Sequence, residues 1–238
     1  MREHRLSELE TIIGYTFKDK KHLETALTHK SYVYEKTIGQ HVSYERYEFL
    51  GDAILEFIVS RYLFEHYEQM SEGELSKLRS SLVCEFTLSK IARELQYGEY
   101  ARFSKGERQT GGANRDSILC DMFESVLGAI YLDGGLDEAV AYVNRFLLTD
   151  IEHKQRFYDA KSRLQEYVQK HRQTLAYELL SETGPDHDKQ FTVRVLIDGK
   201  EMARKTAHSK KTAEQYAAYE VLETLSDENA PADIKKKD

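Results

Sequence analysis

The sequence predicts an α-helical N-terminal domain followed by a smaller C-terminal α+β domain with the element order α-β-β-β-α. The first observation is length, because 238 residues are more than one small module needs. The second is composition: 2 Pro, 13 Gly and no Trp, with long stretches rich in Leu, Glu, Lys, Ala and Arg, favour helix over a turn-rich all-β fold. The third is a change of apolar periodicity after residue 151, from the helical period to strand-like alternation.

Residues 1–150 are the predicted helical domain, because apolar side chains recur there at i, i+3, i+4 and i+7. This periodicity predicts helices over Leu6–Ile13, Leu23–Ser31, Tyr44–Tyr67, Glu72–Leu95, Arg115–Leu132 and Leu136–Asp150. Glycines at positions 98, 111–112 and 134–135 mark expected breaks, and residues 103–113 are expected to form a polar loop.

The pattern of the remaining chain predicts a linker, a second domain and a tail. We expect a short charged linker over residues 151–158, the α+β domain over 159–226 and a disordered tail over 227–238. The predicted elements are a helix over Ser162–His171, strands over Tyr177–Leu180, Phe191–Ile197 and Glu201–Ala207, and a last helix from Ser209 to Leu225. The Asp198-Gly199 pair is typical of a tight hairpin turn, and Ser209 is a good helix N-cap.

Composition and charge exclude several classes of protein. No apolar run approaches the roughly 18 residues of a membrane span, and no secretory leader follows Met1, so we expect a cytoplasmic protein outside any membrane. Cys84 and Cys120 lack the spacing of a disulfide framework or a zinc site. The net charge of −7 belongs to residues 1–150, with 18 basic and 25 acidic side chains, whereas residues 159–225 hold 11 of each. The acidic excess therefore does not exclude a nucleic-acid partner for the second domain.

Two predicted helices carry carboxylates on faces that are otherwise apolar. The acids of the earlier helix share one narrow stripe and are Glu45, Glu48 and Asp52. The acids of the later helix lie three residues apart on one face and are Asp121 and Glu124. Burying carboxylates together costs several kcal/mol unless a cation compensates their charge. Oxygen ligands without His or Cys favour Mg²⁺ or Mn²⁺. Such an ion can drive phosphodiester hydrolysis without a protein nucleophile, so the pattern indicates a nuclease.

Two other interpretations of these acids are weaker. Solvated helix faces commonly carry acidic pairs, but the apolar residues that flank both stripes argue against simple surface charge. A di-iron helix bundle requires Glu three residues before His, and none of the nine His has Glu at that position.

Three segments of the first domain resemble the ribonuclease III domain of the bacterial ribonuclease III family: YERYEFLGDAILEF, GELSKLRSSLV and GGANRDSILCDMFESVLGAIYLDGG. The opening LETIIGYTFKDKKHLETALTHKSY is similar to the first helices of that family, so the resemblance covers about residues 6–150. The resemblance implies an all-α endonuclease domain that dimerises and cuts double-stranded RNA with Mg²⁺, one strand per active site. Mn²⁺ is the expected substitute.

The resemblance also implies roles for individual residues. Glu48, Asp52, Asp121 and Glu124 match the metal-binding acids, with Asp52 and Glu124 also catalytic. Glu45 matches the first acid of the family motif and binds metal either directly or through water. Phe49 matches an aromatic residue that enters a pocket on the partner subunit. The chain departs from the family pattern at Tyr44, Tyr47 and Cys120, where the usual residues are Asn, Leu and Ala.

The second domain resembles a double-stranded RNA-binding domain over its whole length. Such domains read the shape of A-form duplexes through minor-groove hydroxyls and phosphates. The resemblance implies three groups of contacts: Gln165 and Glu166 on the first helix, Pro185 and His187 in the GPDH loop, and Ser209, Lys210 and Lys211 at the start of the last helix. Ala207 stands where the family usually has a glycine.

Together these features predict a homodimeric, Mg²⁺-dependent endoribonuclease that acts on double-stranded RNA and needs no small-molecule cofactor. By resemblance, its expected substrates are precursors of ribosomal and other RNAs. The alternative is a regulator that binds duplex RNA without cutting it, and such a protein would be expected to lack one of the acids. A helical scaffold with acids as surface charge is a third interpretation, which the flanking apolar residues disfavour.

Overall fold

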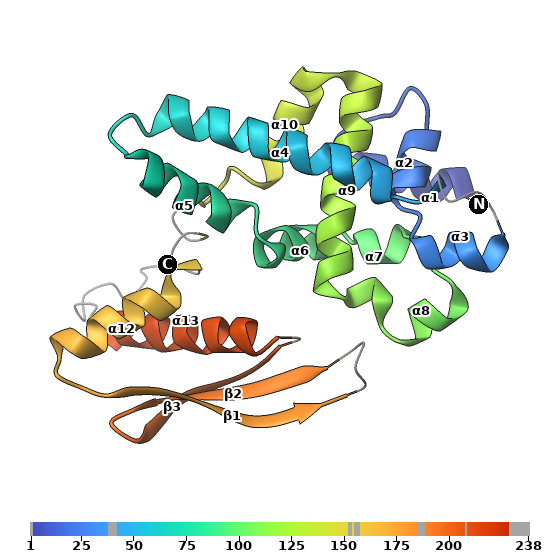
Figure 1. Ribbon diagram of the computed structural model, residues 1–238. Coiled ribbons are helices and arrows are strands. Elements are labelled where there is room, and N and C mark those ends of the chain that lie inside the picture. The colour runs from blue at the N-terminus through green and yellow to red at the C-terminus, as the bar shows by residue number, and fades with distance from the viewer. Residues whose placement is uncertain are drawn as a thin grey trace, which may run out of the picture. The chain divides into compact units, whose positions relative to one another are not determined.

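The chain divides into two units, Met1–Ile151 and Glu152–Asp238, a division one residue after the predicted boundary. The computed structural model describes residues 2–37, 42–151, 154, 158–184, 189–207 and 209–228. The first unit is helical and the second has the order α-β-β-β-α, so the predicted fold class is confirmed (Figure 1). No helix in these described ranges is long and apolar enough to cross a membrane.

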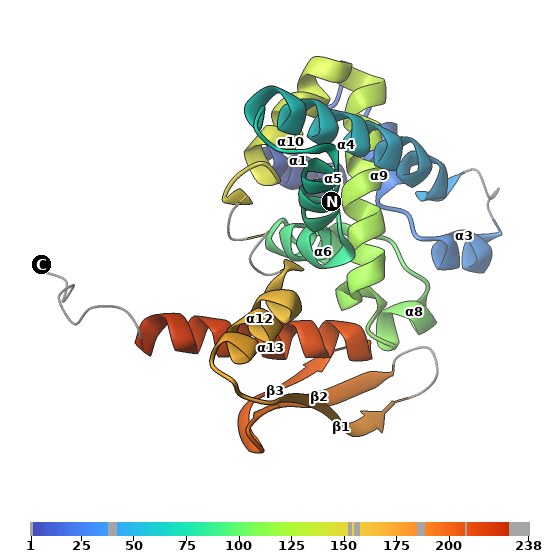
Figure 2. The same cartoon turned by 60° about the vertical axis from the view of Figure 1, so that its left-hand side comes forward.

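The first unit is built from α-helices joined by short connections. They are α1 (Arg2–Ile13), α2 (Lys21–Ala26), α3 (Lys30–Lys36), α4 (Glu45–His66), α5 (Glu72–Leu82), α6 (Glu85–Glu94), α7 (Tyr97–Tyr100), α8 (Lys105–Gln109), the 3-10 helix η2 (Gly112–Asn114), α9 (Asp116–Gly134) and α10 (Leu136–Phe146). Helix α9 runs through the middle of this unit and crosses α4, as Figures 1 and 2 show. The core lies between these two helices and includes Leu55, Phe123 and Val126, all fully buried.

Two of the predicted helices are interrupted. The helix predicted over residues 72–95 is divided between α5 and α6, because Cys84 adopts an extended conformation as the N-cap of α6. The hydroxyl of Thr87 donates to the main-chain carbonyl of Ser81 at 2.9 Å. This bond replaces the main-chain hydrogen bond that the carbonyl would accept in a continuous helix. The helix predicted over residues 23–31 stops at Ala26 and restarts after His29, whose Nδ1 accepts from the main-chain nitrogen of Ser31.

The predicted loop over residues 103–113 is also more ordered than expected. Ser104 caps α8, since its hydroxyl accepts from the main-chain nitrogen of Glu107 at 3.1 Å, and η2 follows. Conversely, α10 ends at Phe146, four residues before the predicted end of that helix.

The second unit packs two helices on one face of an antiparallel sheet (Figures 1 and 2). Its elements are α12 (Ala160–Lys170), β1 (Leu175–Thr183), β2 (Gln190–Ile197), β3 (Lys200–Ala207) and α13 (Lys210–Glu228), and the strand order is β1-β2-β3. Asp198 and Gly199 both have positive φ, 51° and 77°, and form the predicted hairpin turn between β2 and β3. The hydroxyl of Ser209 accepts from the main-chain nitrogen of Thr212 at 3.0 Å and caps α13, which extends two residues into the predicted tail.

Candidate active site and RNA-binding surface

The helices α4 and α9 bring three carboxylates together. One carboxylate oxygen from each of Glu48, Asp121 and Glu124 lies within 4.8 Å of the other two. All three side chains are half-buried, and the acids come from two segments more than seventy residues apart in sequence. These three therefore form a single acidic group in the structure, here called the acid cluster.

The two other predicted acids lie outside the acid cluster. Asp52 is exposed on α4, one turn after Glu48, and its negative charge raises the pKa of Glu124. Glu45 is exposed in the first turn of α4, where Lys30 donates to Oε1 and Ser43 to Oε2, each at 3.3 Å. Both oxygens of Glu45 thus accept hydrogen bonds from side chains outside the acid cluster.

Two glycines allow α4 and α9 to approach so closely. A Cβ atom on Gly51 would overlap the main-chain carbonyl of Glu124, and one on Gly128 would overlap that of Tyr47. Because neither residue has a side chain, the two backbones meet directly and the acids on either side of the crossing converge. Gly51 was not predicted to belong to the site, although a glycine inside an apolar helix is a signal of close packing.

The carboxylates of the acid cluster are costly to ionise. Burial, followed by the charge of Asp121, raises the pKa of Glu48 to about 7. Burial, followed by the charges of Asp52 and Asp121, raises the pKa of Glu124 to about 8. Burial also raises the pKa of Asp121. Acids that resist ionisation near neutral pH are typical of a site that accepts a cation.

The donors of the acid cluster fit a hard divalent cation. All are carboxylate oxygens, which suit Mg²⁺ or Mn²⁺ better than zinc or iron. The sulfur of Cys120 lies 3.9 Å from Oε1 of Glu124, but burial and then the charge of Glu124 raise the pKa of its thiol, so it stays protonated and is a poor ligand. The cluster therefore offers oxygen ligands alone.

Two neighbours of the acid cluster were not identified from the sequence as parts of the site. The hydroxyl of Tyr44 donates to Oδ2 of Asp121 at 2.9 Å. The ammonium group of Lys30 lowers the pKa of both Glu48 and Asp121, against the larger effect of burial. Tyr44 was noted only as a departure from the family pattern, and the pairing of Lys30 with the site depends on tertiary structure.

Phe49 is the most exposed large apolar side chain among the described residues of the first unit, at 82% exposure. It lies on α4 beside a hollow that is also lined by Tyr47, Leu50 and Leu132. Glu45 and Arg46 also line this hollow, so the structure places an exposed aromatic side chain at a recess of mixed apolar and charged lining.

The described residues predicted to bind RNA lie in the middle of α12 and at the start of α13. Gln165 and Glu166 are exposed on α12, and Ser209, Lys210 and Lys211 are exposed at the start of α13. Pro185 and His187 lie outside the described residues.

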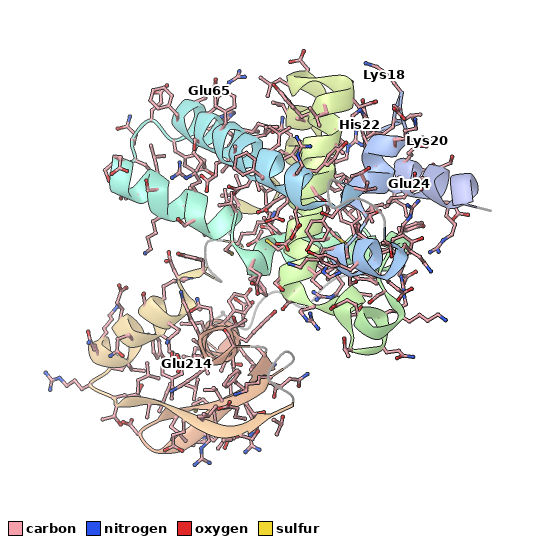
Figure 3. The ribbon with its side chains drawn as sticks, turned by 45° about the vertical axis from the view of Figure 1, so that its right-hand side comes forward. Lys18, Lys20, His22, Glu24, Glu65 and Glu214 are labelled. Atoms are coloured by element: carbon pink, nitrogen blue, oxygen red, sulfur yellow. The ribbon has the colours of Figure 1, made fainter. Side chains whose placement is uncertain are left out.

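The two lysines at the start of α13 differ in their surroundings. Glu214, labelled in Figure 3, pairs with Lys161 of α12, and its other oxygen lies 4.0 Å from the ammonium group of Lys210. Within the described ranges Lys211 forms no ion pair. Lys211 therefore carries the less compensated positive charge of the two.

Comparison with known proteins agrees with this division into two functional parts. The Ribonuclease-III-like family matches residues 19–151, and the double-stranded RNA binding motif matches residues 160–225. The chain is 45% identical over 227 residues to Ribonuclease 3 of Geobacillus kaustophilus, covering 94% of this chain and 92% of the relative. It is 41% identical over 222 residues to Ribonuclease 3 of Listeria monocytogenes, covering 92% of this chain and 97% of the relative.

A solved structure gives the same result for the first unit. The nuclease domain of ribonuclease III from Campylobacter jejuni is 42% identical and aligns with a TM-score of 0.54, covering 58% of this chain and 93% of that one. The resemblance inferred from the sequence motifs is therefore confirmed. Because the matches span both units, the chain belongs to the ribonuclease III family, the endoribonucleases that act on double-stranded RNA.

Proposed function

We propose that the chain is a homodimeric, Mg²⁺-dependent ribonuclease that hydrolyses one strand of an RNA duplex at each of two active sites. The observation that carries this proposal is the acid cluster, which joins Glu48 with Asp121 and Glu124. Mn²⁺ is the expected substitute for Mg²⁺, since both ions prefer oxygen ligands. When bound, the metal supplies an activated water and stabilises charge on the attacking and leaving oxygens.

The protein's own residues divide the remaining work. Glu48, Asp121 and Glu124 hold the metal, for which they must lose their protons. Asp52, exposed one turn after Glu48 on α4, is proposed as a further metal ligand and, with Glu124, as a catalytic carboxylate; its negative charge already raises the pKa of Glu124. Glu45 is proposed to act through water and not as a direct ligand, because Lys30 and Ser43 occupy both of its oxygens.

The proposed dimer places Phe49 against a second copy of the chain. The Campylobacter jejuni nuclease domain is described with a region involved in dimer formation. The exposure of Phe49 and the adjacent hollow, partly lined by Tyr47, Leu50 and Leu132, fit a two-fold interface in which each chain offers both a projecting ring and a recess.

The second unit is proposed to hold the duplex. Gln165 and Glu166 would contact a minor groove, and Ser209, Lys210 and Lys211 would bind phosphates across the major groove. Contacts by Pro185 and His187 stay predictions of the resemblance. The proposed substrates are precursors of ribosomal and other RNAs in the cytoplasm, and the reaction requires no small-molecule cofactor.

The proposal is tested with end-labelled RNA on a denaturing gel. Full-length protein is incubated with a duplex in Mg²⁺, in Ca²⁺ and in chelator, beside the same labelled strand unpaired. We expect discrete fragments from the duplex only, and only with Mg²⁺. Duplex that is bound but uncut by folded, dimeric protein would instead support the regulator that binds without cleaving.

A further inference from the structure

Tyr44 is held firmly at the start of α4. Its side chain is 3% exposed, and its ring lies 5.6 Å from that of His29 between centroids. Its main-chain nitrogen donates to the carbonyl of Thr28 at 2.9 Å, and its own carbonyl accepts from the main-chain nitrogen of Glu48 at 2.9 Å. The phenol hydroxyl therefore has a fixed position relative to the acid cluster.

That hydroxyl contacts Oδ2 of Asp121, while Oδ1 accepts no hydrogen bond from any residue that the structure describes. The bond is 2.9 Å long and joins α4 to α9, the two helices that supply the acid cluster. Repulsion from Glu48 and Glu124 would favour rotation of Asp121 away from the cluster when no cation is present. The hydroxyl of Tyr44 opposes this rotation through its hydrogen bond to Asp121. Because the hydroxyl is uncharged, it leaves the negative charge of Asp121 uncompensated and available to the metal.

We infer that Tyr44 is a positioning residue for metal binding, which holds Asp121 in the orientation needed to complete the acid cluster. This inference rests on the proposed metal-dependent function. It concerns a feature of this chain, since Tyr44 stands where the family usually has Asn, and its buried side chain reaches Asp121 from a backbone held by two main-chain hydrogen bonds.

The test compares two substitutions that each remove one tyrosine hydroxyl bonded to an aspartate. Tyr44→Phe deletes the bond to Asp121, and the matched control Tyr15→Phe deletes the 2.6 Å bond to Oδ2 of Asp133 at the other end of α9. Binding of Mn²⁺ alone to the full-length proteins, without RNA, is measured by titration calorimetry. We expect the Kd for Mn²⁺ to rise about tenfold or more in Tyr44→Phe, the range usual for loss of a partner that orients a metal ligand. Tyr15→Phe should bind Mn²⁺ as the wild type does.

A second readout separates positioning from general damage to the fold. In cleavage assays, Tyr44→Phe should need about tenfold more Mg²⁺ for half-maximal rate, while its KM for duplex RNA and its far-UV circular dichroism stay those of the wild type. An unchanged Kd for Mn²⁺ in Tyr44→Phe, or an equal rise in both variants, would overturn the inference alone. Absence of Mn²⁺ binding by the wild type would overturn the metal-dependent function and the inference with it.

Discussion

Gly51 of α4 packs directly against the main-chain carbonyl of Glu124 in α9. Glu124 thus contributes a carboxylate to the acid cluster, and its backbone also determines how closely the two helices approach. Three residues before Gly51 on α4, Glu48 contributes a carboxylate to the same cluster. Helix packing and site geometry therefore depend on the same contact.

Gly51→Ala should damage both stability and cleavage. The added methyl group would overlap a backbone carbonyl that cannot move without shifting α9, and overpacking of this kind costs about 1–3 kcal/mol. The matched control is Gly73→Ala in α5, where a Cβ atom would meet nothing within 4 Å; it should stabilise the protein by about 0.4–1 kcal/mol. Urea denaturation with a cleavage assay checks both values, and a fully stable, active Gly51→Ala protein would contradict the proposed role of the crossing.

Glu124→Gln should separate cutting from binding. The substitution keeps the shape of the side chain but removes a metal-facing charge, so cleavage should be abolished while the Kd for duplex RNA stays within about twofold of the wild-type value. Gel-shift and cleavage assays on the same duplex measure the two effects, with the exposed α10 acid Glu138→Gln as control. If binding falls as much as cutting, the division of roles between the two units is wrong.

Metal-free protein should lose stability as pH rises. The pKa values of Glu48 and Glu124 are about 7 and about 8 in the folded state, above the value of 4.5 for an unperturbed glutamate. Between the pKa of an unperturbed glutamate and the raised pKa of each group, the folded state binds more protons than the unfolded state. The free energy of unfolding therefore falls as the pH increases through this range. From about pH 5 to about pH 8 the free energy of unfolding should decrease more in the wild type than in Glu124→Gln. The difference should be on the order of 1–2 kcal/mol, after allowance for the partial exposure of Glu124.

The measurement for this pH dependence is urea denaturation in chelator at several pH values. Saturating Mg²⁺ should remove most of the loss above neutral pH, because a bound cation stabilises the ionised carboxylates. Identical pH profiles for wild type and Glu124→Gln would show that the acid cluster does not retain protons in the folded state.

The acids could be predicted from the sequence because helical period and ligand chemistry are both local properties. The stripe on α4 and the pair on α9 follow from residue spacing alone. The bond from Tyr44 to Asp121 and the fit of Gly51 under Glu124 could not, since both depend on how two distant helices cross. The resemblance implied that Glu48, Asp52, Asp121 and Glu124 converge, and the structure groups three of these four within 4.8 Å.

The errors in element boundaries have a similar origin. Apolar periodicity continues through Cys84, so the sequence predicts one helix where the structure has α5 and α6. The break depends on hydrogen bonds from side chains to the carbonyl of Ser81, which compete with the helical ladder and leave the apolar pattern unchanged. Strands β2 and β3 were predicted to within one residue because alternation and the Asp198-Gly199 turn are short-range signals, whereas β1 extends beyond the predicted Tyr177–Leu180 at both ends.

Lys211→Ala should weaken duplex binding in a salt-dependent way. Lys211 is exposed in the first turn of α13, and loss of one phosphate contact should reduce the slope of log K against log salt by about 1. The matched control is Lys205→Ala on β3, whose ammonium group pairs with Glu220 at 2.9 Å. Filter binding at several salt concentrations gives the slopes, and equal slopes for wild type and Lys211→Ala would exclude a phosphate contact. The cleavage rate at saturating RNA should stay unchanged.

Phe49→Ala should weaken the dimer. Burial of one Phe side chain contributes about 1.5–3 kcal/mol to the free energy of association. A two-fold interface contains Phe49 from both chains, so the substitution removes this contribution twice. The Kd of the dimer should therefore rise by about 10²–10⁴-fold. The control is Tyr34→Ala, which removes another aromatic side chain, 63% exposed, from α3.

Sedimentation velocity over a range of protein concentrations measures this change, and the cleavage products show its consequence. Each chain carries its own Glu48, Asp121 and Glu124, so a monomer keeps a complete acid cluster but can reach only one strand of the duplex. Where Phe49→Ala is monomeric, nicks in single strands should replace paired cuts in both. If Phe49→Ala protein forms dimers at the same protein concentrations as the wild type, Phe49 is not the dimer contact. The ring, 82% exposed in the single chain, would then contribute nothing to association.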